Sequence, residues 1–392
     1  MSPIKINIVD LKNIVSKLNL AIEKTKINPK AGWIELEILS EKQMSLKVAN
    51  FDYYINAKIP IDCDSFDELN HLHVTVSADT FVPLVSKLED QFVYISSGYN
   101  CIIFTTDTNE YTFPIITELG KVKCVDRLVY SPISGDNSFE LSGQELSSIA
   151  ESNSRGLVDT IISREIQQFI YIDTLGAITF TENIYINTFS TVNKENELTP
   201  YTKFLINCTQ AKLLKIFEQF NSVKIDVELF SEESSKKVRF TTSENNIYIE
   251  MIFVVQSDEL TDCFPSIRLR AIADKVRDVH AILDKKTLDK ALSRLMVFDK
   301  KFDITVLDYS KLVFSSNGLK MISVKNKNYE KVDYIKSKNT FDYEAVIRFA
   351  DLVAQLKAIK TKEIDISYGD SAIVINSGNL KQLIPENKVE RV

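Results

Sequence analysis

The stretch that decides the fold is VTVSADTFVPLVSKLED at residues 74–90. It begins with alternating apolar and polar residues, which is typical of a half-buried strand, and continues with apolar residues at helical spacing. Nearly the same succession returns as LINCTQAKLLKIFEQF at 205–220 and as FDYEAVIRFADLVAQLK at 341–357. Three copies of one strand–helix phrase indicate an internal repeat.

The copies recur at an interval that matches the length of a domain. When Val76 is aligned with Ile206 and Phe341, successive copies lie 130 and 135 residues apart. A strand followed by a first helix opens each copy, and the β-rich flanks recur in the same order. Each copy therefore predicts the order β-α-β-β-β-α-β-β-β, with three strands between its two helices.

We predict an α+β chain of three tandem domains at residues 1–134, 135–268 and 269–392. In each domain, two helices pack on one face of strongly curved antiparallel sheets. The stretch DRLVYSPISGDNS at 126–138 contains Pro, Gly, Asn and Ser and indicates a linker. The second junction, CFPSIRLRAIADKVRD at 263–278, is expected to be partly helical.

The composition excludes several classes of protein. Apolar residues make up 44 % of the 392 residues, which is enough for several packed cores and too much for a disordered chain. The sequence contains neither an apolar run of 18 residues nor the apolar core of a signal peptide near its start. Its five cysteines are scattered without a Cys-x-x-Cys pair. These features favour a cytoplasmic protein with reduced thiols and no membrane partner.

The charge is distributed unevenly along the chain. The formal net charge is −7, yet the last third holds 23 Lys and Arg against 17 Asp and Glu. A basic third inside an acidic chain favours an anionic partner that binds locally.

Signatures of catalysis are missing from the sequence. It has no phosphate-binding or dinucleotide-binding glycine motif, no GxSxG turn, and only ten glycines. His71 and His73 would share one face of a strand, but no third metal ligand stands out near them. We expect a protein that is not an enzyme, with no catalytic residues, no metal site and no cofactor.

Three tandem domains that each present two helices on one face resemble the bacterial-type DNA sliding clamp, the beta processivity subunit of the replicative DNA polymerase. The matching phrases are SADTFVPLVSKL, EYTFPIITE, FPSIR and LKQLIP, and the resemblance covers nearly the whole chain. It implies half of a closed ring, completed as a head-to-tail homodimer around duplex DNA. It also implies a DNA polymerase and a clamp loader as partners in DNA replication.

A clamp that slides needs a cationic inner wall that holds phosphates without reading bases. Lys286, Lys290 and Arg294 follow one another at i, i+4 and i+8, which predicts a basic row on one helix. A solvated charged face is the alternative for any single lysine. The residues assigned to DNA contact are Lys17, Lys24, Lys26, Lys30, Lys87, Lys212, Lys215, Lys286, Lys290, Arg294, Arg348 and Lys357. The matching helix of the second domain offers only Arg155, so we expect little contact there.

The resemblance also implies an apolar groove between the second and third domains that binds partner peptides. Ordinary inter-domain core is the alternative. Its candidate walls are Thr181, Ile184, Tyr185, Ile186, Pro265, Leu269, Phe302, Ile373, Leu383, Ile384 and Pro385. The stretch TENIYIN departs from the family's usual acidic-Gly-His-Arg run, and the chain continues past Pro385 as ENKVERV. These departures favour a phage- or plasmid-encoded clamp.

Ring closure would join the edge of the first domain to the edge of the third domain of a second copy. The assigned contacts are Tyr111 and Phe113 against Met296 and Val297, for which intradomain core is the alternative.

A different class of function also remains open: a non-catalytic repeated-domain protein for protein interaction or structure, without a DNA role.

Overall fold

The computed structural model describes residues 3–23, 28–63, 72–118, 121–130, 137–153, 165–181, 185–191, 202–228, 235–299, 310–323, 327–339 and 341–386. The chain divides into two compact units. The N-terminal unit comprises Met1–Ser147, Pro200–Phe204 and Thr209–Asp258, and the C-terminal unit comprises Ser148–Thr199, Leu205–Cys208 and Glu259–Val392.

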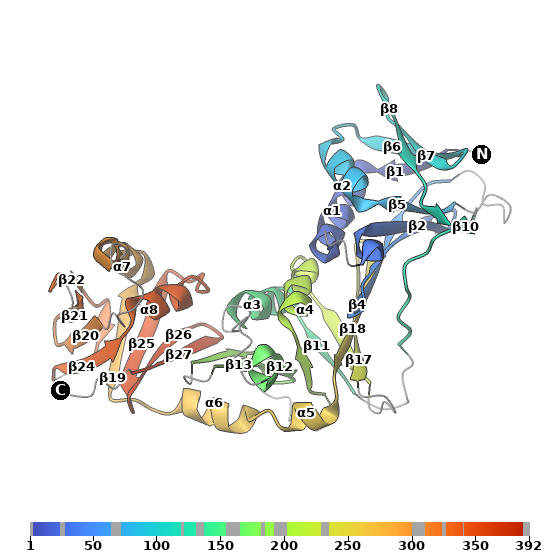
Figure 1. Cartoon of the computed structure of the whole chain (residues 1–392). Helices are drawn as coiled ribbons and strands as arrows, with labels where there is room; N and C mark the ends of the chain where they lie inside the picture. The colour runs from blue at the N-terminus through green and yellow to red at the C-terminus, as the bar shows by residue number, and fades with distance from the viewer. Residues whose placement is uncertain are drawn as a thin grey trace. The chain divides into compact units, whose positions relative to one another are not determined.

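The N-terminal unit is built on an eight-stranded antiparallel sheet (Figure 1). Its strands, in spatial order, are β11 (Ser138–Leu141), β16 (Val223–Val227), β17 (Ser235–Glu244), β18 (Ile247–Gln256), β4 (Tyr53–Pro60), β3 (Gln43–Ala49), β2 (Trp33–Ser40) and β5 (His73–Ser77). The smaller sheets contain β1 (Ile4–Asn7), β6 (Phe92–Gly98), β7 (Cys101–Thr105) and β8 (Glu110–Pro114), and the pair β9 (Thr117–Glu118) and β10 (Lys121–Val122).

The helices of this unit follow short strands, as the repeated phrase predicts. They are α1 (Ile8–Leu18), α2 (Ala78–Lys87), α4 (Cys208–Leu213) and the 3-10 turns η1 (Asn19–Ala21), η2 (Pro29–Gly32) and η5 (Leu214–Phe217). Helix α3 (Gly143–Asn153) has residues in both units, and the first residue of α4, Cys208, belongs to the C-terminal unit. Helices α1 and α2 pack side by side. Asn7 caps α1, since its Oδ1 accepts a hydrogen bond of 2.8 Å from the backbone N–H of Val9.

The C-terminal unit has a nine-stranded sheet and a four-stranded sheet. The larger sheet orders β15 (Phe204–Ile206), β12 (Ile170–Asp173), β13 (Gly176–Phe180), β14 (Ile186–Ser190), β27 (Leu380–Pro385), β26 (Ala372–Ser377), β25 (Glu363–Gly369), β19 (Val279–Asp284) and β23 (Lys336–Ser337). The smaller sheet orders β22 (Tyr329–Val332), β21 (Gly318–Ser323), β20 (Ser310–Ser315) and β24 (Tyr343–Ile347). The helical segments are η4 (Glu165–Gln168), α5 (Asp258–Asp262), α6 (Ser266–Asp274), α7 (Lys285–Asp299) and α8 (Phe349–Leu356).

The order of elements repeats three times along the chain. A strand and a helix are followed by four strands, a second helix and three strands, with the pair β9 and β10 added in the first third and β23 in the last third. Our expectation of three strands between the helices is wrong. The stretch at 33–61 turns twice, at residues 41–42 and 50–52, and so forms three strands before β5 adds a fourth. The expectation of a partly helical junction at 263–278 is confirmed by α6.

The boundary between the two compact units falls within the middle third of the chain, so this third contributes residues to both units. Strands β16, β17 and β18 of that third join the N-terminal sheet, where β18 pairs with β4. Strands β12, β13 and β14 join the C-terminal sheet, where β14 pairs with β27. The boundaries at 134 and 268 therefore remain a prediction from the sequence.

Gly143 lets α3 begin close to the chain segment that follows α4. Its N–H donates a hydrogen bond of 2.9 Å to the carbonyl oxygen of Phe220. A Cβ at this position would lie 1.7 Å from the carbonyl oxygen of Phe217, so any larger residue must displace backbone. Gly32 is different, since a Cβ there would meet nothing nearer than 4.0 Å.

We therefore expect Gly143→Ala to lower the free energy of unfolding by about 1–3 kcal/mol, the usual cost of forcing atoms into a packed site. Chemical denaturation followed by circular dichroism measures the change. Gly32→Ala is the matched control and should stay within about 0.5 kcal/mol of the unmodified protein. Equal effects of the two substitutions would contradict the close approach at Gly143.

Candidate functional site

Helix α7 carries the basic row that the sequence predicts. Leu288, Leu292 and Leu295 are buried on one side of the helix and belong to the core of the C-terminal unit. Lys286, Lys290 and Arg294 are exposed on the other side. Asp284 caps the helix, because its Oδ1 accepts a hydrogen bond of 2.8 Å from the N–H of Thr287. The predicted geometry of the row is confirmed.

The three cations of this row differ in whether a carboxylate already pairs with them. Arg294 forms a two-pronged ion pair with Glu330 on β22, in which Nε and an Nη atom each lie 2.7 Å from a carboxylate oxygen. This pairing raises the pKa of Arg294 and lowers that of Glu330. Among the described residues, neither Lys286 nor Lys290 has an ion-pair partner. Two lysines are therefore the free cations of the row.

Lys17 contradicts its assignment to an exposed DNA-contacting face. Its side chain is buried, and its ammonium donates to the carbonyl oxygen of Ile216 at 3.2 Å and to Gln219 at 3.4 Å. The ammonium also lies 5.2 Å from the centre of the Phe220 ring. Burial lowers the pKa of Lys17. The face of α1 that would be exposed on an isolated helix is covered by the segment around η5, so Lys17 holds two parts of the chain together.

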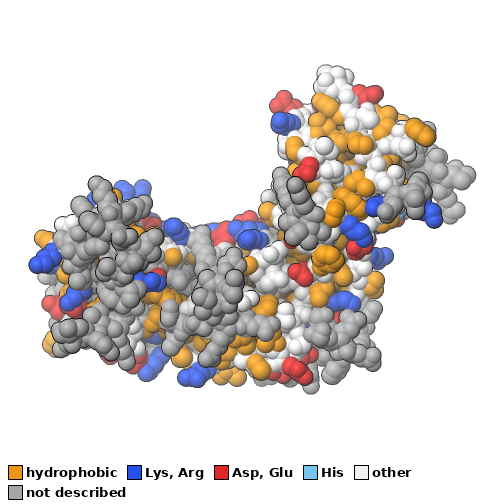
Figure 2. Space-filling view, in the orientation of Figure 1, with side chains coloured by type: hydrophobic (Ala, Val, Ile, Leu, Met, Phe, Trp, Pro, Cys, Tyr) orange, Lys and Arg blue, Asp and Glu red, His pale blue; other side chains and the backbone are white. Residues whose placement is uncertain are grey.

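The other assigned cations differ in exposure and pairing. Lys87, Lys212 and Lys357 are exposed, and Lys215 is partly buried. Lys30 binds both carboxylate oxygens of Asp126, at 2.7 and 2.9 Å. Lys24, Lys26 and the single arginine of the second domain's helix, Arg155, lie outside the described residues. On the face drawn in Figure 2, the Lys and Arg side chains of the described residues lie among Asp and Glu side chains.

Arg348 takes part in a hydrogen-bonded network with Asp351 and with Tyr185, which belongs to the middle third of the chain. Its guanidinium binds both carboxylate oxygens of Asp351, each at 2.8 Å. The hydroxyl of Tyr185 donates to the same carboxylate at 2.5 Å. Burial, together with Asp351, raises the pKa of Tyr185 to about 12, so the hydroxyl stays protonated as a donor. Arg348 therefore joins the start of α8 to Tyr185 and is not a free cation.

The residues assigned to an apolar peptide groove do not form one wall. Leu383 and Ile384 are adjacent on β27, and successive side chains of a strand point to opposite faces of its sheet. Leu383 packs with Ile186 and Leu269 in the cluster under α6. Ile384 packs with Ile373 in the cluster under α7 and α8. All five are buried, so their assignment as walls of one open groove is wrong.

The remaining groove candidates are partly exposed or lie outside the described part, and of these Tyr185 packs against the cluster that contains Ile384. Thr181, Tyr185, Pro265 and Pro385 are partly exposed. Ile184 and Phe302 lie outside the described residues.

The predicted ring-closing residues divide between core and surface. Phe113 on β8 is buried, with its ring centre 5.1 Å from that of Phe104 and 5.6 Å from that of Phe81, so its assignment as a contact between copies is wrong. Tyr111 is partly exposed on the same strand. Met296 packs partly against the core, whereas Val297 is 60 % exposed. Within their sheets, β8 and β22 are both edge strands.

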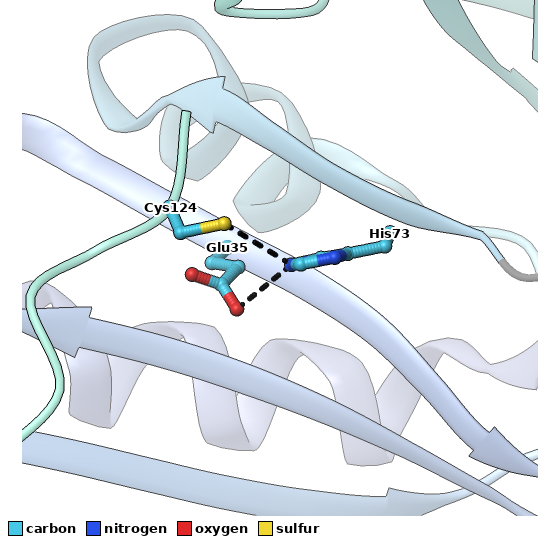
Figure 3. A group of neighbouring side chains, drawn as sticks. All are labelled: Glu35, His73 and Cys124. Carbon is cyan, nitrogen blue, oxygen red and sulfur yellow. Dashed lines mark hydrogen bonds and ion pairs between the residues drawn. The ribbon is translucent and has the colours of Figure 1, made fainter. Parts of the chain in front are cut away.

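A further group of side chains was missed by the sequence reasoning. Glu35 on β2, His73 on β5 and Cys124 after β10 lie together (Figure 3). The expectation that no third ligand stands near His73 is therefore wrong. Glu35 and Cys124 are 38 and 51 residues from His73 in sequence, so no short motif could reveal them.

The repeated order of elements, with neighbouring repeats joined through shared sheets, defines the fold of a DNA sliding clamp. The beta subunit of DNA polymerase III from Thermotoga maritima matches with a TM-score of 0.75 and 14 % identity, covering 100 % of both chains. The beta subunit from DNA polymerase of Streptococcus pyogenes matches with a TM-score of 0.75 and 16 % identity, covering 99 % of this chain and 100 % of that one.

A DNA polymerase sliding clamp from Bacillus subtilis has a TM-score of 0.71 and 14 % identity, with the same coverage as the streptococcal protein. No protein-family model matches the chain, and no match was found among curated proteins. The predicted resemblance and the α+β fold of three tandem clamp domains are confirmed by these solved structures. In the described part of the chain, every helix is too short or too polar to span a membrane.

The burial of Lys17 leads to a prediction about stability. We expect Lys17→Ala to lower the free energy of unfolding by about 1–3 kcal/mol, because the buried carbonyl of Ile216 loses its donor. Urea denaturation measures this loss. Lys286→Ala, at an exposed site on α7, is the control and should change stability by less than about 0.5 kcal/mol. A fully stable Lys17→Ala protein would contradict a structural role for this lysine.

Proposed function

We propose that the chain is a cytoplasmic DNA sliding clamp, a non-catalytic processivity factor that encircles duplex DNA as a head-to-tail homodimer and tethers a DNA polymerase. The observation that carries this proposal is the match to a polymerase beta subunit across 100 % of both chains. A ring around DNA needs no active site of its own. Its task is to hold the bound polymerase on the template DNA.

Contact with DNA is assigned to the exposed lysines of the repeated helices. The exposed members of the set carry this role best: Lys286 and Lys290 on α7, Lys87 on α2, Lys212 on α4 and Lys357 at the end of α8. Each binds phosphate oxygens as a mobile point charge and reads no base. Paired cations such as Arg294 contribute less charge, which keeps the contact weak enough for sliding.

Ring closure is assigned to one edge strand of each four-stranded sheet. In this arrangement β8 of one copy pairs with β22 of a second copy, and the reverse pairing closes the ring. Each four-stranded sheet would then become part of an eight-stranded sheet. Exposed backbone edges invite strand pairing, so closure also removes two sites of unwanted association.

The polymerase and the clamp loader are assigned to the surface of the C-terminal unit. Leu383 and Ile384 are buried and would not touch a partner, so contact with partner peptides is assigned to the partly exposed residues Thr181, Pro265 and Pro385. We expect such a peptide to bind through apolar anchor residues, because apolar side chains gain most from leaving water.

The oligomeric state and the topology of DNA binding test the proposal together. Light scattering after gel filtration should give about twice the chain mass of 44.7 kDa. Protein on nicked circular DNA should remain bound through gel filtration, and linearisation should release it, because only an open end frees a ring. A monomer, or equal retention on circular and linear DNA, would favour the non-catalytic interaction protein.

The lysines of α7 lead to a second prediction. Lys286→Glu with Lys290→Glu should shorten retention on circular DNA, and the slope of log affinity against log salt should fall by about 2 for two lost phosphate contacts. Lys336→Glu with Lys338→Glu has the same change in charge at two exposed lysines outside the assigned helices and serves as control. Equal loss in both double variants would show that net charge, and not the α7 face, holds DNA.

A further inference from the structure

Three side chains with metal-binding atoms converge on one side of the eight-stranded sheet (Figure 3). Nε2 of His73 lies 3.0 Å from Oε1 of Glu35, and Sγ of Cys124 lies 3.6 Å from the same nitrogen. The three ligand atoms all lie within 4.8 Å of one another. They come from β2, β5 and the segment after β10, so the fold itself brings them together.

Two of the three separations are close to those around a tetrahedral zinc ion. Zinc bonds of about 2.0–2.1 Å to nitrogen, about 2.0–2.2 Å to oxygen and about 2.3 Å to sulfur place ligand atoms about 3.3–3.6 Å apart. The distance between His73 and Cys124 falls in this range, and that between Glu35 and His73 is slightly shorter because the two share a hydrogen bond. A set of one nitrogen, one oxygen and one sulfur donor suits zinc better than the hard cations Mg²⁺ or Ca²⁺.

The carboxylate is held in place by a second hydrogen bond. Oε2 of Glu35 accepts from the backbone N–H of Val125 at 2.8 Å, which leaves Oε1 to face His73. The Glu35 side chain is 4 % exposed, whereas Cys124 is exposed to solvent. A cation could thus enter beside Cys124, and water could complete its coordination.

Lys47 is the competitor for Glu35. Its ammonium lies 2.8 Å from Oε1 of Glu35 and also binds Glu37. The carboxylates of Glu35 and Glu37 and the ammonium of Lys47 together carry a net charge of −1. Ionisation of the Cys124 thiol brings this charge to −2, which a bound divalent cation would neutralise. Lys47 can remain on Glu37 when Glu35 binds the cation.

A reactive thiol is the other chemistry that a Cys–His pair supports. The carboxylate of Glu35 opposes it, because this group lies within 4.8 Å of Sγ and repels a free thiolate, whereas a cation attracts both groups. A bound cation would displace the thiol proton directly.

We propose that Glu35, His73 and Cys124 form a binding site for one zinc-class divalent cation. The site fastens the segment that follows β10 to strands β2 and β5, next to the hydrogen bond between Val125 and Glu35. Its role is structural, and the proposal does not depend on the DNA clamp function.

Metal titration of the full chain tests the site. After removal of metal with a chelator, Co²⁺ should bind at one equivalent per chain and give a thiolate-to-cobalt charge-transfer band in the near ultraviolet. Cys124→Ser should abolish this band, and His73→Ala should weaken Zn²⁺ binding by more than about tenfold, since loss of even an outer-shell partner typically costs about 10–100-fold. Cys263→Ser, at another exposed cysteine, should leave both unchanged.

Two further measurements test the site even if one of these variants folds poorly. Zn²⁺ should raise the thermal midpoint of the unmodified protein and of Cys263→Ser, but not that of Cys124→Ser. Lys47→Gln should bind Zn²⁺ more tightly, because the competing ammonium is gone. Absence of stoichiometric binding, binding that survives Cys124→Ser and His73→Ala, or binding that Lys47→Gln fails to strengthen would overturn the site.

Discussion

The pairing of backbone edges between neighbouring repeats is the constraint on which the rest of this structure depends. A repeat with open strands at its border leaves N–H and C=O groups without partners. Here β4 meets β18, from Tyr53 opposite Phe253 to Lys58 opposite Tyr248. In the C-terminal unit, β14 meets β27 in the same antiparallel manner. The sheets therefore run through the borders of the repeats, and the middle third contributes to both compact units.

Local periodicity predicted the parts of the fold that depend on neighbouring residues. The strand–helix phrase and the basic row of α7 were visible because a helix repeats every three to four residues. The number of strands was missed because the two tight turns at residues 41–42 and 50–52 lack the Pro-Gly or Asn-Gly pairs that usually mark them. The opposite orientations of Leu383 and Ile384 follow from strand alternation, and they were missed because both residues were assigned by resemblance alone.

Contacts between distant segments explain the remaining errors. Lys17 has the spacing of a solvent-facing lysine on an amphipathic helix, and only a segment 199 residues further on makes it an internal residue. Likewise, Phe113 belongs to an aromatic cluster whose members come from α2, β7 and β8. The Glu35–His73–Cys124 group needs two strands and a connecting segment to meet. None of these arrangements can be recognised from a short stretch of the sequence, because each is formed by segments that are distant along the chain.

The junction of β14 with β27 has a consequence for biosynthesis. Ile186 pairs with Leu383, so about 200 residues must be translated after one partner before the other exists. The nascent chain therefore carries an unpaired edge for much of its synthesis, at a rate of about 5–20 residues per second. Such late closure makes the growing polypeptide vulnerable to aggregation on the ribosome, and a protein of this design benefits from chaperones until its last strand emerges.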